Sequence, residues 1–104
     1  MKIQVNTDKN VTGSDELRLS FSALLSEELE RFDDQITRLE VHLSDENGRK
    51  DGLDDKRCLI EARIEGRQPI VVTDEASNHE QAVKGAAGKL KNKLNTIFGR
   101  MRNY

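Results

Sequence analysis

The 104-residue chain contains little cysteine, few aromatic residues and no long apolar segment. Its single cysteine, Cys58, cannot form a disulfide within the chain, which agrees with a reducing compartment, and we expect a buried, inert thiol. No run of about 18 apolar residues is present to span a bilayer. Residues 1–5 begin a strand-like pattern instead of the apolar region of a signal peptide. We therefore predict a soluble, cytoplasmic protein that does not bind membranes.

Residues suited to catalysis or metal binding are equally scarce. His42 and His79 are the only histidines, and both are predicted on the surface, one on a strand and one in the first turn of a helix. The chain has no Cys-x-x-Cys, no His-Glu-x-x-His and no phosphate-binding glycine loop. The acids of residues 45–55 do not fit the glycine and glutamate positions of a calcium-binding EF-hand loop. We expect no enzymatic activity, no catalytic residue, no metal, no cofactor and no small-molecule substrate.

The apolar residues of the first half follow two different periods. Residues 2–6 alternate polar and apolar side chains, as in a strand with one buried face, and residues 7–13 have turn chemistry. A helix of about five turns is predicted from an N-cap at Ser14 to Phe32, because its apolar residues recur every three or four positions. Alternation returns at residues 36–44, which predicts a second strand.

The second half follows a polar connection and is predicted to contain two strands and then a helix. Residues 45–55 are charge-dense and contain glycine, so we expect a mobile loop. Strands are predicted at residues 57–65, with the smaller side chains inward, and at residues 70–73, joined by a tight turn at residues 66–69. Ser77 and Glu80 have the capping-box spacing and predict the start of a final helix of about six turns. Gly85 and Gly88 within it suggest close packing on the sheet.

The predicted order is β-α-β-β-β-α. Each helix has one apolar face and the strands alternate, so the simplest arrangement is an α+β fold of two layers. We expect a four-stranded sheet with both helices packed on one face and the other face exposed to solvent. The chain length is that of one domain, and we predict a single domain over residues 1–104.

Charge is distributed unevenly along the chain. Residues 1–80 carry 11 basic and 19 acidic residues, whereas residues 81–104 carry six cations and no acid. On a helical surface these cations fall on two flanks of the apolar stripe, and both flanks are basic. Such a helix suits a phosphate backbone or an acidic partner. The candidate RNA-binding residues are Lys89, Lys93 and Arg100 on one flank and Lys84, Lys91 and Arg102 on the other.

Three segments give the chain a resemblance to a known family. They are the opening Met1-Lys2-Ile3-Gln4-Val5, the helix end Leu29-Glu30-Arg31-Phe32-Asp33-Asp34 and the basic run Gly88-Lys89-Leu90-Lys91-Asn92-Lys93-Leu94. With the element order above, the chain resembles the ribosome hibernation promoting factors, also called ribosome-associated inhibitors, over nearly its whole length. Lys89 matches the family's basic motif directly, whereas Asn92 stands where the family tends to have an arginine. The chain is therefore similar to a divergent, short-form member without the dimerisation domain of longer ones.

The resemblance implies a cytoplasmic protein that binds ribosomal RNA of the small subunit, in the channel for messenger and transfer RNA. Occupancy there would silence or preserve idle ribosomes in stationary phase or under stress. The residues leave a second hypothesis open, in which the acidic body of one chain meets the basic helix of another or of a different protein, without ribosome binding. Weak self-association would then follow from the same charge asymmetry.

Overall fold

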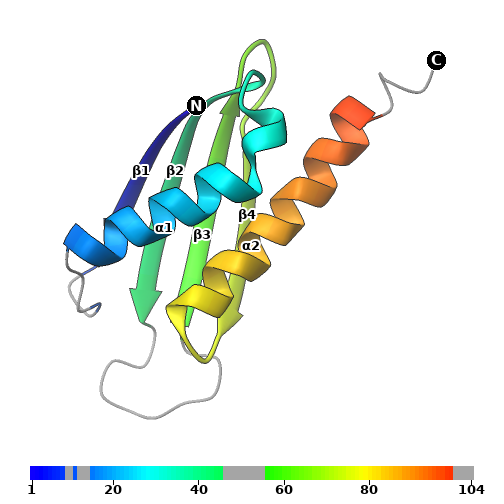
Figure 1. Ribbon diagram of the computed structural model, residues 1–104. Coiled ribbons are helices and arrows are strands. Elements are labelled where there is room, and N and C mark those ends of the chain that lie inside the picture. The colour runs from blue at the N-terminus through cyan, green and yellow to red at the C-terminus, as the bar shows by residue number, and fades with distance from the viewer. Residues whose placement is uncertain (9–10, 12–14, 46–55, 100–104) are drawn as a thin grey trace.

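A computed structural model describes residues 1–8, 11, 15–45 and 56–99. It contains a four-stranded sheet in the order β1-β2-β3-β4, with two helices packed on one face (Figure 1). The predicted α+β fold and element order are confirmed. The elements are β1 (Lys2–Thr7), α1 (Asp15–Glu28), η1 (Glu30–Phe32), β2 (Ile36–Asp45), β3 (Lys56–Ile64), β4 (Ile70–Ala76), α2 (His79–Leu94) and η2 (Asn95–Gly99).

The sheet is mixed. β1 pairs with β2 in parallel, so the chain must cross over between them, and α1 makes that crossover. β2, β3 and β4 pair antiparallel in sequence order, and Gly66, with φ +77°, supplies the left-handed residue that the β3–β4 turn needs. β1 and β4 are therefore the two edges of the sheet, and β4 is three residues longer than predicted.

The core lies between the sheet and the helices. β3 contributes small and branched side chains at alternate positions, as predicted, and Cys58 among them is fully buried. α1 contributes Phe21 and Leu25, and α2 contributes a stripe that packs mainly on β3 and β4. The buried residues of that stripe are Ala82, Val83, Ala86, Ala87, Leu90 and Leu94.

The first helix ends earlier than predicted. α1 stops at Glu28, and the chain then tightens into the 3₁₀ turn η1. The Phe32 amide donates to the Leu29 carbonyl at 2.9 Å. Because residues three apart eclipse in such a turn, Leu29 and Phe32 both face the core. The N-cap predicted at Ser14 lies outside the described residues.

The N-cap of the second helix is Asn78, so the prediction of a capping box on Ser77 is wrong. The Asn78 side-chain oxygen accepts a hydrogen bond from the Gln81 amide at 2.8 Å. Ser77 instead has its hydroxyl near the Gln81 side chain. An asparagine caps as well as a serine, and the first turn starts one residue later than the spacing suggested.

The second helix also changes geometry near its end. After Leu94 it widens into η2, a turn of π-helix, whereas a regular helix was predicted to residue 101. The Thr96 hydroxyl donates to the Asn92 carbonyl at 3.0 Å, a side-chain bond that competes with the helical ladder. Ile97 and Phe98 are half-buried here, and Phe98 packs against the core. The residues beyond Gly99 lie outside the description.

Candidate nucleic-acid interface

The four described cations of α2 lie outside the core on two sides of its buried stripe, as predicted. Lys89 and Lys93 face β4, because both line a hollow with Val71. Lys84 and Lys91 face α1, because each shares a hollow with Glu28 of that helix. Arg100 and Arg102 fall outside the described residues, so the structure places four of the six predicted RNA-binding residues on one exposed helix.

Lys89 is held against the edge strand. Its ammonium nitrogen Nζ donates to the Thr73 carbonyl at 2.7 Å and lies 3.0 Å from Asp74 Oδ1. Asp74 fits there because it packs against Gly85, where a Cβ atom would overlap its carboxylate. The close packing predicted for the glycines is therefore correct at Gly85 and wrong at Gly88, which has open space around it.

The flank that faces α1 is also paired. Lys91 Nζ lies 3.2 Å from Glu28 Oε2, and Lys84 Nζ lies 3.7 Å from Glu80 Oε2 one turn earlier in the same helix. Each of these side chains is roughly half-exposed. Exposed pairs of this kind contribute at most about 1 kcal/mol, so a phosphate can compete for the lysines.

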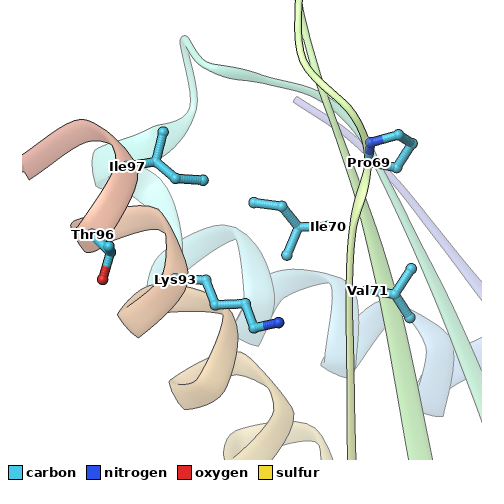
Figure 2. Close-up of a pocket in the computed structure, with 6 residues that line it drawn as sticks. All are labelled: Pro69, Ile70, Val71, Lys93, Thr96 and Ile97. Atoms are coloured by element: carbon cyan, nitrogen blue, oxygen red, sulfur yellow. The ribbon is translucent and has the colours of Figure 1, made fainter.

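Lys93 differs from the other three because it forms no ion pair within the described part of the chain. It extends from α2 toward β4 over a hollow of about 370 Å³ (Figure 2). The walls of this hollow are otherwise aliphatic or hydroxylic, and the same lysine borders a second hollow further along β4. The lining residues of the first are Pro69, Ile70, Val71, Lys93, Thr96 and Ile97.

Sequence reasoning identified the cations but missed the acids that pair with them. Glu28 and Asp74 lie 63 and 15 positions before their lysine partners. Nothing in the local pattern signals such contacts. Only Glu80, four residues before Lys84, could have been anticipated from the i, i+4 spacing on a helix.

The solvent-exposed face of the sheet carries its own paired charges. Glu40 and Glu61 stand directly opposite each other on β2 and β3. Arg38 Nη2 lies 3.1 Å from Glu40, and Arg63 Nε lies 3.4 Å from Glu61, so each acid has a cation on its own strand. Arg38 also donates to the Gln4 side chain. This face is mixed in sign and gives no continuous basic track.

The remaining candidate chemical groups do not gather into a site within the described residues. His42 is exposed on the open sheet face, as predicted, whereas His79 is half-buried with Nε2 3.3 Å from the Ser44 carbonyl oxygen. Burial raises the pKa of the Cys58 thiol to about 12, with a smaller contribution from the negative charge of Asp74. Asp45 ends β2 and lies 3.2 Å from Lys56 Nζ, and the other acids of the predicted loop are not described. Among the described residues, no three potential ligands gather into a metal site.

Comparisons with known proteins give a matching family and two solved structures of similar fold. Residues 4–102 match the family described as sigma 54 modulation protein / S30EA ribosomal protein. The N-terminal domain of Protein Y from Thermus thermophilus has a similar fold, with a TM-score of 0.74 and 21% identity over 93% of this chain and 99% of that one. A ribosomal subunit interface protein from Coxiella burnetii aligns with a TM-score of 0.69 and 19% identity over 95% and 99% of the two chains. No curated protein sequence matches the chain. Among the described helices, none is long and apolar enough to cross a membrane.

Proposed function

Because the chain belongs to the sigma 54 modulation protein / S30EA ribosomal protein family, we propose that it is a non-catalytic, ribosome-associated factor of the cytoplasm. It binds ribosomal RNA of the small subunit through α2 and silences or preserves idle ribosomes under stress or in stationary phase. The name of the Coxiella burnetii relative, a ribosomal subunit interface protein, supports the choice of the ribosome as partner.

One observation carries the proposed site. The four lysines lie on both sides of the buried stripe of α2 and outside the core, so they can approach a phosphate backbone without disturbing that core. They are Lys84, Lys89, Lys91 and Lys93. Arg100 and Arg102 continue the basic run in sequence and complete the proposed set. A helix with cations on both sides of its axis can contact phosphates on either side.

The RNA is recognised by its shape and phosphates. Base stacking needs exposed aromatic side chains, and in the described part of the chain Phe21 and Phe32 are buried and Phe98 is half-buried. Lysine contacts phosphates as a compact point charge, and the counterions that it displaces make binding depend strongly on salt. The RNA must also displace the carboxylates of Glu28, Asp74 and Glu80 from their lysines.

The test is co-sedimentation with small ribosomal subunits in sucrose gradients at low and raised salt. We expect the protein in the small-subunit peak at low salt and its loss from that peak as salt rises. Absence from the peak at low salt would overturn the proposal. An in vitro translation assay on the same material then asks whether bound protein lowers protein synthesis.

Substitutions of the lysines test whether α2 is the surface that binds the ribosome. Lys89→Gln with Lys93→Gln removes two phosphate contacts, so the slope of log affinity against log salt should fall by about 2. Glutamine is preferred to glutamate at position 89, because a new acid beside Asp74 would repel it. The matched control, Lys2→Gln with Arg18→Gln, removes two exposed cations elsewhere on the molecule. If both double substitutions weaken ribosome binding equally, and both variants keep native circular dichroism, the result would argue against α2 as the binding surface.

Self-association is the alternative, and the internal ion pairs favour it in one respect. They demonstrate that α2 cations and acids of the body do attract each other at 3.0–3.2 Å. The same pairing between chains would give a dimer that dissociates with salt. Light scattering across ionic strength distinguishes the two functions, since such a dimer would form without RNA and would not follow the ribosomal peak.

A further inference from the structure

A groove runs between the edge strand β4 and the second half of α2. It consists of two neighbouring hollows of about 370 and 460 Å³ that share Val71 and Lys93. Figure 2 shows the first of them, with Ile97 and Lys93 extending from the helix and Ile70 and Val71 standing on the strand. The second is lined by Val71, Val72, Thr73, Lys89, Asn92 and Lys93.

The strand side of this groove has backbone groups that point away from β3. β4 has β3 on one side and no strand on the other within the described sheet. The Thr73 carbonyl accepts its hydrogen bond from Lys89, so it points away from β3. Because backbone groups alternate direction along a strand, those of Val71 point the same way. Among the described residues, Val71 and Leu19 are the large apolar residues that stand out as exposed, and Val71 is 49% exposed.

The groove combines aliphatic side chains with positive charge. Ile70 and Ile97 border the first hollow from opposite elements, and no described residue that lines either hollow is acidic. Lys93 has no ion pair among the described residues. A second cation, Arg67, lies at the end of the groove near Pro69, with its Cζ atom 5.8 Å from the centroid of the Phe98 ring. The hollow between α1 and α2 differs, since three acids line it together with Arg31 and Lys91.

We propose that this groove binds an extended, acidic segment of a protein. The segment pairs with the outward backbone groups of Val71, seats an apolar side chain between Ile70 and Ile97, and directs a carboxylate to Lys93. Addition of a strand to an open sheet edge is an established mode of peptide recognition, in which backbone bonds supply affinity and side-chain pockets supply specificity. The aliphatic walls and the outward backbone groups of Val71 favour a peptide over RNA, whose bases need aromatic surfaces to stack on.

The test is titration of the ¹⁵N-labelled protein with synthetic peptides followed by NMR. The probe is an acetylated and amidated hexapeptide, Asp-Thr-Val-Thr-Asp-Thr, which places its aspartates and its valine on the same face of an extended chain. The matched peptide replaces each aspartate with lysine, and a single-stranded RNA hexamer provides a nucleic-acid arm. We expect the aspartate peptide to shift the amides of Val71 and Thr73 and to bind about tenfold more tightly than the lysine peptide.

Two variants and one control complete the design. Lys93→Gln should weaken the aspartate peptide roughly threefold, as expected for one exposed charge contact. Val71→Pro removes an amide that points away from β3, which an edge strand tolerates, and should abolish the backbone pairing. Leu19→Gln changes the other exposed large apolar residue, on α1, and should leave binding unchanged.

The result that overturns the proposal is equal binding of the two peptides, shifts confined to other parts of the sheet, or no shift at millimolar peptide. Shifts at Val71 from the RNA hexamer alone would assign the groove to nucleic acid. The experiment contains no ribosomes, so its failure leaves the proposed ribosomal function standing, and the reverse is also true.

Discussion

Lys91 Nζ on α2 lies 3.2 Å from Glu28 Oε2 at the end of α1, a contact between residues 63 positions apart. With the Lys89–Asp74 and Lys84–Glu80 pairs, it means that three of the four described cations of α2 have an acid of the same chain beside them. The helix that appears strongly basic in sequence is therefore partly neutralised in the folded protein. Its affinity for a polyanion depends on how readily those acids are displaced.

Removal of the acid that pairs with Lys91 should strengthen RNA binding. Glu28→Gln frees the lysine and deletes a nearby negative charge, so affinity for small subunits at low salt should rise roughly 1.5- to 5-fold. Glu16→Gln is the matched control, because it removes one exposed acid from the other end of α1. The gradient assay measures both, and an equal gain for the two variants would mean that total charge alone matters.

The position of the helix cap can be tested with two adjacent substitutions. Asn78→Ala removes the side-chain oxygen that accepts the Gln81 amide and should lower the free energy of unfolding by about 1 kcal/mol. Ser77→Ala should change it by less than about 0.5 kcal/mol, as expected for a surface substitution. Urea denaturation compares the two. A larger loss at Ser77 would restore the capping box that the sequence suggested.

The two helix glycines should respond differently to alanine. Gly88→Ala meets open space and should stabilise the protein by up to about 1 kcal/mol through helix propensity. Gly85→Ala forces its Cβ atom against the Asp74 carboxylate, and the resulting overlap should reduce stability relative to Gly88→Ala by about 1–2 kcal/mol. Addition of Asp74→Ala to Gly85→Ala should relieve the penalty in a double-mutant cycle. Equal effects of alanine at the two positions would disprove the close contact.

The buried thiol gives a defined dependence on pH. Its pKa rises from 9.0 to about 12 in the folded protein, mainly because burial disfavours the thiolate. The folded state therefore retains a proton that the unfolded state loses, and stability falls as pH rises from about 9 to about 12, by at most about 1.4 kcal/mol per unit.

Comparison with Cys58→Ala isolates this effect, because the two proteins differ only at that side chain. Guanidinium denaturation at several alkaline pH values should give a steeper loss of stability for the natural chain than for the variant. Parallel curves would contradict the raised pKa. At neutral pH, the folded thiol should resist alkylation and react only after denaturation.

Most of the fold could be predicted from local pattern. Alternation of polar and apolar residues located β2 and β3, because a strand with one buried face requires that period. The helix ends were less predictable. The first helix tightens into η1 after Glu28, where the Phe32 amide donates to Leu29. The second helix widens into η2 after Leu94, where the Thr96 hydroxyl donates to Asn92. Neither contact follows from a sequence period.

The sequence by itself determined that the cations gather on the last helix and that the helix has one buried side, since both facts follow from residue order and the helical repeat. Only the tertiary structure decided which cations are paired. Glu28 and Asp74 reach their lysines because α1 and β4 pack on either side of α2, and such neighbours have no fixed separation along a chain. The groove beside Lys93 exists for the same reason, because β4 ends the sheet where α2 crosses it.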